Sequence, residues 1–383
     1  MSNILTQTSG KNLTFSDLKE NLLAIKEARY DLVVSSEKLE VLSPACLTTP
    51  YMPDAITDQG VGVPIMDWEL TSHAFGQWCN KFNVPTKFLA NLADWGNTSA
   101  YMDLSMEIMD KHNKQEQKPL LLRGLIDPET GDKFCRAIVS PSYSIIENFD
   151  VLSAVFEGFK VVREEHNIGF EPGPASVSDK HMRARINMPQ LSVVADELLK
   201  DYKSPFTGKT GIDNPVVFMG IEVRNSEVGA GAFTLVPSVI IQVCDNGMTL
   251  TNDIYRKVHL GSAQDAGVIS QRTVRATMEL ITSETIDKVI EIAHPDFIQE
   301  KVNELKGLKK PVEPKFVATY LQTAFEHEQA VDIFDDFVKG GDISAFGVAQ
   351  AITSYSQRES VNADAAQSLD DSAIDHAVAL ATV

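Results

Sequence analysis

The sequence predicts an α+β protein, with a mainly antiparallel sheet framed by an N-terminal helical group and a C-terminal helical region. Three observations predict this class. Helix-like apolar spacing with capping residues appears near the N-terminus, and strand-like apolar runs joined by short turns rich in Asp and Gly occupy the middle. From residue 263 onward, apolar spacing is helical almost to the end of the chain.

We expect three units from this pattern: residues 1–118, a helical group with a short strand pair; residues 119–262, a central α+β sheet domain; and residues 263–383, a helical region with an acidic tail. Thr14 and Asp17 form a capping signal for the first long helix. Residues 31–36 and 38–42 look like paired strands. The Pro- and Gly-rich stretch 43–64 is either a domain joint or an ordered excursion.

Two hairpins and an alternating strand define the central unit. The turn DPETGD joins apolar runs on either side of residues 127–132, and the Gly-rich stretch 225–232 joins two further runs. In residues 181–188, Met and aliphatic side chains alternate with His181, Arg183, Arg185 and Asn187. Such alternation is typical of a half-buried strand, and here it predicts an exposed basic side.

Charge constrains the choice of partners. The formal net charge is -19, which opposes attraction of nucleic acid. However, residues 320–383 hold eleven acidic residues against Lys339 and Arg358, so this tail carries nine of the excess negative charges. The body of the chain can therefore still carry a local basic groove.

The expected location is the cytoplasm of a host cell. No apolar run is long enough to cross a membrane, and the N-terminus lacks the pattern of a secretory signal. The four cysteines have no framework spacing, which favours reduced, buried thiols.

A set of cations spread over the sheet and the next helix is the main functional signal. With nearby aromatic side chains it predicts a face that neutralises a nucleic-acid backbone and stacks unpaired bases. The candidate residues are Arg123, Arg136, Lys180, Arg183, Arg185, Arg224, Arg256, Lys257, Arg272 and Arg275. The alternative is a set of solvated or salt-bridged side chains.

Catalytic and cofactor chemistry have weaker signals. Cys244, Asn246 and His259 lie near one another in sequence, and a thiol beside a base is the minimum for nucleophilic catalysis. The simpler interpretation of Cys244 is a small buried hydrophobe. Neither metal-ligand spacing nor a phosphate-binding loop is present, and Gly229 and Gly231 fit a hairpin turn, so we expect no cofactor and no metal.

Several segments together resemble one known family. These are AFGQWCNKFNVPTKFL, LLLRGL, FCRAIVSPSYSIIENFDVL, GIEVRNSEVGAGAF, VIIQVCDNGMT and, near the C-terminus, SAFGVAQAITSYSQ and ADAAQSLDDSA. In order and spacing they resemble the phage/plasmid-like proteins of mobile genetic elements, which are catalogued as a domain of unknown function. The resemblance implies a setting near recombination, replication or antirestriction genes, and it supplies no catalytic residues.

We therefore expect a non-enzymatic DNA-metabolism protein that binds or anneals single-stranded DNA and assembles into a homo-oligomer. The acidic C-terminal region is expected to mimic DNA, to compete for the basic face, or to recruit a recombination or repair protein. Two alternatives remain open. One is an enzyme that uses Cys244, Asn246 and His259; the other is an antirestriction or protein-interaction factor with an acidic, DNA-like surface.

Overall fold

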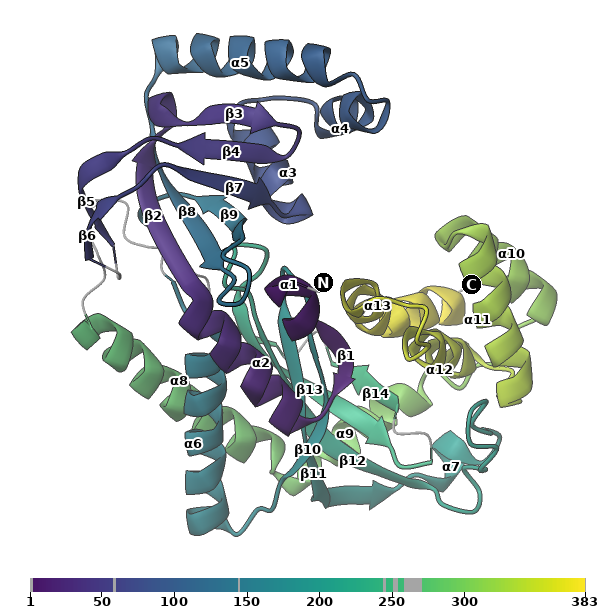
Figure 1. The fold of residues 1–383 in the computed structure, drawn as a ribbon. Helices are drawn as coiled ribbons and strands as arrows, with labels where there is room; N and C mark the ends of the chain where they lie inside the picture. Colours follow the sequence, from purple (N-terminus) through teal and green to yellow (C-terminus); the bar gives the residue numbers. More distant parts are fainter. Residues whose placement is uncertain are drawn as a thin grey trace.

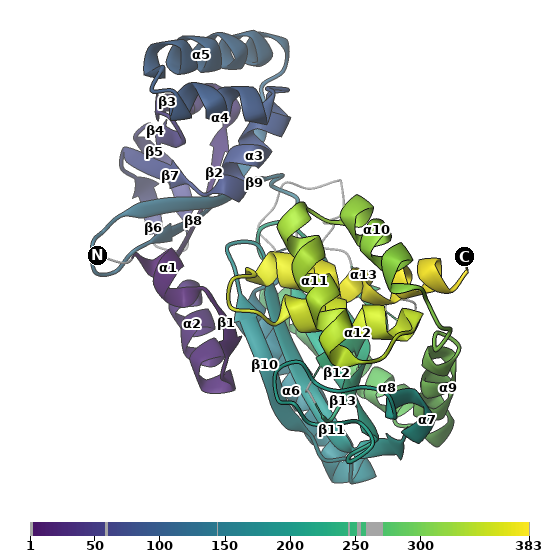
Figure 2. The same ribbon diagram turned by 90° about the vertical axis from the view of Figure 1, so that its right-hand side faces the viewer.

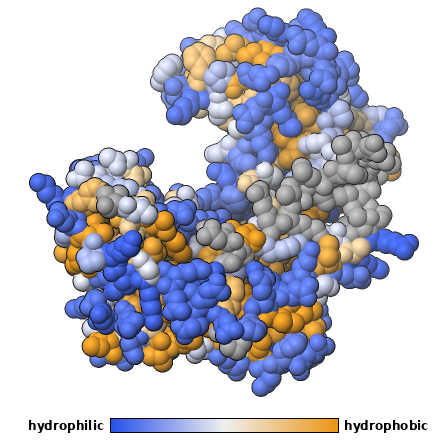
Figure 3. Space-filling model, turned by 180° about the vertical axis from the view of Figure 1, so that it is seen from behind, coloured by the Kyte–Doolittle hydropathy of each residue, from blue (hydrophilic) through white to orange (hydrophobic). Residues whose placement is uncertain are grey.

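A computed structural model describes residues 3–57, 60–143, 145–243, 246–250, 254–257 and 271–382. Two antiparallel-rich sheets, each with its own helices, form two joined bodies, of which the body with the six-stranded sheet is the upper one in Figure 1. Seen from behind, the surface is hollowed between the upper body and the C-terminal helices (Figure 3). The predicted α+β class is confirmed.

The first body is built on a six-stranded sheet with the order β2-β8-β9-β7-β4-β3. Its neighbouring strands are antiparallel except for the β7–β9 pair. The strands are β2 (Arg29–Ser35), β3 (Glu40–Ser43), β4 (Cys46–Thr49), β7 (Met66–Leu70), β8 (Pro119–Ile126) and β9 (Lys133–Val139). The other elements of this body are η1 (Ser36–Lys38), a ribbon of β5 (Met52–Thr57) and β6 (Gly60–Val63), and three helices, α3 (Ser72–Lys81), α4 (Thr86–Asp94) and α5 (Thr98–Gln115).

The arrangement of this sheet corrects the expected unit boundary and strand pairing, and it decides between the two alternatives for residues 43–64. A boundary between residues 118 and 119 falls inside the sheet, because β2 pairs along its length with β8. β2 and β3, expected to pair with each other, lie at opposite edges. The described residues of the stretch 43–64 include β4, β5 and β6, so they form an ordered excursion and not a domain joint. The N-terminal unit is thus a sheet covered by helices, and the predicted 127–132 hairpin belongs to it.

The second body is built on a seven-stranded sheet in which every pair is antiparallel. Its order is β1-β10-β11-β12-β13-β14, and β15 also pairs with β13. The strands are β1 (Gly10–Leu13), β10 (Glu171–Val177), β11 (Met182–Val194), β12 (Val216–Asn225), β13 (Phe233–Ile241), β14 (Asn246–Thr249) and β15 (Tyr255–Lys257). The hairpin predicted around residues 225–232 is the β12–β13 connection.

Helices cover both sides of this sheet. α1 (Ile4–Thr8), α2 (Phe15–Ala28), α6 (Asn148–His166), α7 (Asp196–Leu199), α8 (Gln271–Ile292) and α9 (Pro295–Lys306) accompany the strands, and α10 (Pro314–Ala324), α11 (His327–Gly340), α12 (Ala345–Ser356) and α13 (Ala363–Ala381) form the C-terminal group. In Figure 2, α10 to α13 lie in front of the strands, and α6 and α8 lie behind them.

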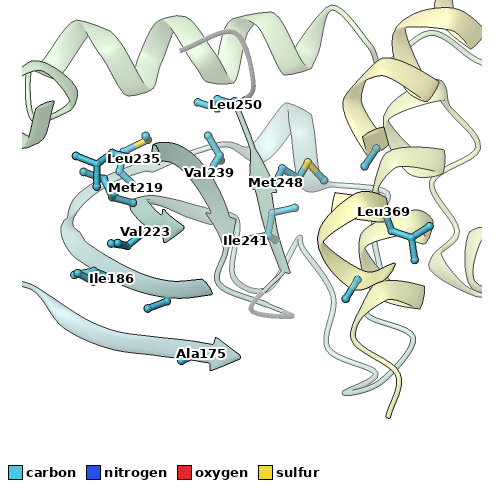
Figure 4. Packing of buried hydrophobic residues seen from close by; sticks show 14 of the residues in the cluster. Ala175, Ile186, Met219, Val223, Leu235, Val239, Ile241, Met248, Leu250 and Leu369 are labelled. Atoms are coloured by element: carbon cyan, nitrogen blue, oxygen red, sulfur yellow. The ribbon is translucent and has the colours of Figure 1, made fainter. Parts of the chain in front are cut away.

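The apolar side of the sheet holds the main core. Met182, Ala184, Ile186 and Met188 of β11 are fully buried, as their alternation predicted. Figure 4 shows Ile186, Met219, Val223 and Leu235 gathered on neighbouring strands. The same hydrophobic cluster includes residues of α6 and α8, so these helices close the apolar side.

Local signals explain where several helices begin and end. Thr14 and Asp17 form the predicted capping box at the start of α2. The C-terminal helical region is interrupted between α10 and α11, because Phe325 and Glu326 take extended conformations. Within the described part of the chain, none of the helices has the length and apolarity needed to cross a membrane.

Candidate nucleic-acid interface

The candidate interface is the side of the seven-stranded sheet that carries polar side chains. We define the polar face by Arg183, Arg185 and Asn187 of β11 and by Glu222 and Arg224 of β12. In the antiparallel register, Arg183 lies directly opposite Arg224, and Arg185 lies opposite Glu222. Like charges that face each other across two strands are destabilising unless an anion lies near both.

The sheet supplies one such anion itself. Glu222 contacts both arginines: its Oε1 accepts from Nε of Arg224 at 2.5 Å, and its Oε2 pairs with Nε of Arg183. Burial alone would raise the pKa of Glu222, but the two guanidinium groups hold it below its ordinary value. One carboxylate nevertheless leaves the buried Arg224 and the half-buried Arg183 with a net positive charge.

The C-terminal helix α13 supplies the remaining anions. Asp371 binds Arg224 through two parallel hydrogen bonds, at 2.7 Å from Nη1 to Oδ2 and 2.5 Å from Nη2 to Oδ1. Asp370 accepts from Nη2 of Arg183 at 2.6 Å and from the Ser356 hydroxyl at 2.5 Å. Burial raises the pKa of Asp370, although Arg183 opposes this shift. The polar face is therefore neutralised by an acidic helix.

A third aspartate of α13 binds the turn before β11. Oδ1 of Asp364 accepts from the Ser178 hydroxyl at 2.8 Å and lies 3.2 Å from Nδ1 of His181. Its Oδ2 lies 3.8 Å from Nζ of Lys180. Through these interactions, α13 contacts the turn before β11 as well as the polar face.

The predicted exposure of the basic side of residues 181–188 is wrong. Arg185 and Asn187 are more than nine-tenths buried, because α12 and α13 cover the side of the sheet that the alternation left polar. A cleft of about 330 Å³ remains beside them, between β10, β11 and the two helices. Its lining includes Lys11, Arg183, Arg185, Glu222 and Asp370.

Lys11 connects the N-terminal strand to the C-terminal helices. Its ammonium donates to the carbonyl oxygens of Ser356, Arg358 and Val361 at 2.5, 2.8 and 3.0 Å. Ser356 ends α12, where the helix dipole favours a positive charge. Lys11 thus holds the connection between α12 and α13.

We expect Lys11→Met to lower the free energy of unfolding by about 1.5–3 kcal/mol, because three carbonyl groups lose a charged donor. Urea unfolding monitored by circular dichroism measures this change. Lys19→Met is the matched control, since Lys19 is exposed on α2, and its effect should stay within about 0.5 kcal/mol. Equal effects of the two substitutions would contradict the anchoring role.

Arg123 and Arg136 are not part of the candidate interface, because both are buried in the junction between the two bodies. We call residues 225–232 the joining turn. Nη1 of Arg123 donates to the Glu227 carbonyl at 2.5 Å, its Nη2 donates to Oε1 of Glu147 at 2.7 Å, and Nη2 of Arg136 donates to Oε2 of Glu227 at 2.7 Å. Their guanidinium groups hold the joining turn against β8 and β9.

Further contacts fix the joining turn in place. Val228 is fully buried among Leu121, Ala137 and Val139 of the six-stranded sheet. Its carbonyl accepts from Nε2 of Gln77 at 2.9 Å. Although burial raises the pKa of Glu147, Arg123 and Arg29 hold it at about 2, so this carboxylate stays charged inside the junction.

The remaining predicted residues lie on elements other than β11 and β12. Arg272 and Arg275 are exposed at the start of α8, which packs on the opposite side of the sheet. On β15, Lys257 lies opposite Phe233, and Arg256 lies opposite Thr234. Thr234 in turn lies opposite Arg224, so the backbone position of Arg256 continues the row of Arg183 and Arg224. Of the proposed catalytic group, Cys244 and His259 lie outside the described residues, and Asn246 begins β14.

Sequence reasoning missed the aspartates that complete the polar face. Composition pointed to an acidic C-terminal region, but Asp364, Asp370 and Asp371 gave no signal of their strand partners. Their spacing on α13 was the available clue, because Asp364 and Asp371 are seven residues apart and share one side of a helix.

No family model, curated protein or solved structure matches this chain. The resemblance to phage/plasmid-like proteins stays a prediction.

Proposed function

We propose that this chain binds single-stranded DNA through the polar face of its seven-stranded sheet, as a non-enzymatic DNA-metabolism protein of a mobile element. The proposal includes a homo-oligomer as the working form and the host cytoplasm as its location. The observation that carries it is the in-register pair of Arg183 and Arg224, which requires anions from outside the sheet.

The geometry of this pair suits phosphate. Arginine binds carboxylate and phosphate oxygens with the same forked pair of hydrogen bonds. Arg224 already makes such a fork with Asp371, whose carboxylate occupies the place of a phosphate. Lys180 and Arg185 extend the row of cations along β11 and the turn before it. A strand of DNA on this face would meet several cations in succession.

The test measures binding of a fluorescent oligothymidylate at several salt concentrations. Because the Asp371 carboxylate already binds the Arg224 guanidinium, all comparisons are made in a variant that carries Asp371→Asn, the reference chain. Adding Arg224→Gln to this chain should weaken binding and reduce the slope of log K against log salt by about 0.7, the value for one phosphate contact on a single strand. The chain with both Asp371→Asn and Arg224→Gln lacks both charges of the fork, so neither of these two charges is left without the other.

Arg163→Gln in the same reference chain is the control, because Arg163 is exposed on α6, behind the sheet. It should leave the affinity and the slope unchanged. Equal effects of Arg224→Gln and Arg163→Gln would overturn the assignment of the polar face. Absence of binding at low salt by every variant would favour the acidic protein-interaction alternative.

A further inference from the structure

We propose that α13 is an intramolecular competitor of nucleic acid, which occupies the polar face until a polyanion displaces it. This inference rests on the proposed function and adds the regulation of the same site. Its basis is the number and position of the carboxylates, because Asp364, Asp370 and Asp371 follow the row of cations from Lys180 to Arg183 and Arg224.

The charges on the two sides match. Without α13, the polar face and the turn before it present Lys180, Arg183, Arg185 and Arg224 against two carboxylates, Glu222 and Asp179. With α13 in place, three aspartates are added to this surface. A helix that neutralises the cations in this way excludes a phosphate backbone from the same positions, since both would occupy the same guanidinium groups.

The apolar contacts of α13 suit a helix that can leave. Its buried apolar side consists of Ala366, Ala373 and Ala377, together with Leu369 and Leu380. Burial of a methyl group stabilises much less than burial of a leucine side chain. Ionic contacts therefore carry a larger share of the docking of α13 than they would for a leucine-rich helix.

Two of the three carboxylates remain accessible to competing ions. The side chains of Asp364 and Asp371 are 31% and 30% exposed, whereas that of Asp370 is 11% exposed. Partly exposed ion pairs weaken with ionic strength and exchange partners more readily than buried ones. The partly exposed carboxylates that pair with Lys180 and Arg224 are thus where a nucleic acid first replaces the helix.

The experiment compares oligothymidylate affinity of the full wild-type chain with that of Asp371→Asn, at low salt. Loss of the forked contact should raise affinity about tenfold, the change that corresponds to one charge-assisted hydrogen bond. Asp364→Asn should raise it by a smaller factor, because Lys180 lies 3.8 Å away. Asp375→Asn is the control, since Asp375 is exposed one turn further along α13, and it should leave affinity unchanged.

The outcomes separate this inference from the proposed function. If wild type and Asp371→Asn bind equally well and Arg224→Gln still weakens binding, the polar face binds DNA and the competitor role is overturned. If Asp375→Asn raises affinity as much as Asp371→Asn, general removal of negative charge explains the effect and the role is likewise overturned. If no variant binds, the proposed function fails first. Circular dichroism confirms that each variant is folded.

Discussion

Arg123→Met should lower the free energy of unfolding by about 3–5 kcal/mol, as expected when one member of a buried ion pair is removed. Arg123 is 2% exposed and lies between Glu147 and Asp31, with its Nη1 on the Glu227 carbonyl. The substitution leaves these carboxylates buried without their common partner. Urea unfolding of the full chain measures the loss.

Lys114→Met is the control for this experiment. Lys114 pairs with Asp110 at 2.5 Å, but both side chains are more than three-fifths exposed. Water solvates both charges, so removal of this pair should cost no more than about 1 kcal/mol. A cost for Arg123→Met as small as that of the control would contradict a structural role for the junction.

Val228→Asp should destabilise the chain by a similar amount, about 3–5 kcal/mol, because it places a carboxyl group in an apolar site. Val228 is fully buried among Leu121, Ala137 and Val139, where the joining turn meets the six-stranded sheet. The loss should diminish as pH falls, since protonation removes the charge whose burial is costly. Thermal unfolding at pH 7 and at pH 5 measures both effects.

Val33→Asp provides the matched comparison. Val33 lies on β2 of the same sheet but is 53% exposed. The introduced carboxyl stays in water there, so the cost should remain within about 1 kcal/mol and should not depend on pH in this range. Equal costs at Val228 and Val33 would mean that the joining turn does not fix the two bodies together.

Local patterns in the sequence predicted much of the secondary structure. The alternation of residues 181–188 and the turn at 127–132 appear in the structure as expected, because strand period and turn chemistry depend on neighbouring residues. The association of β2 with β8 was missed, since residues 29–35 and 119–126 are far apart in sequence and no local pattern specifies their pairing.

The chemistry of the candidate site was harder to predict. A buried arginine and an exposed one look alike in a sequence, so Arg123 and Arg136 entered the same set as Arg183 and Arg224. The buried arginines of the junction differ from those of the polar face in their ion-pair partners, such as Glu147, Glu227 and Asp371. These partners lie on other elements. The Gly-rich stretch 225–232 was recognised as a turn, but its role in joining two sheets required the tertiary structure.

Hydrogen exchange of the full-length chain, with and without oligothymidylate, tests most directly whether DNA and α13 occupy the same face. We expect the amides of residues 363–381 to lose protection when the oligonucleotide binds, while those of α6 on the other side of the sheet keep theirs. Saturating oligonucleotide that leaves the protection of α13 unchanged would contradict the account, because helix and DNA would then bind to different places.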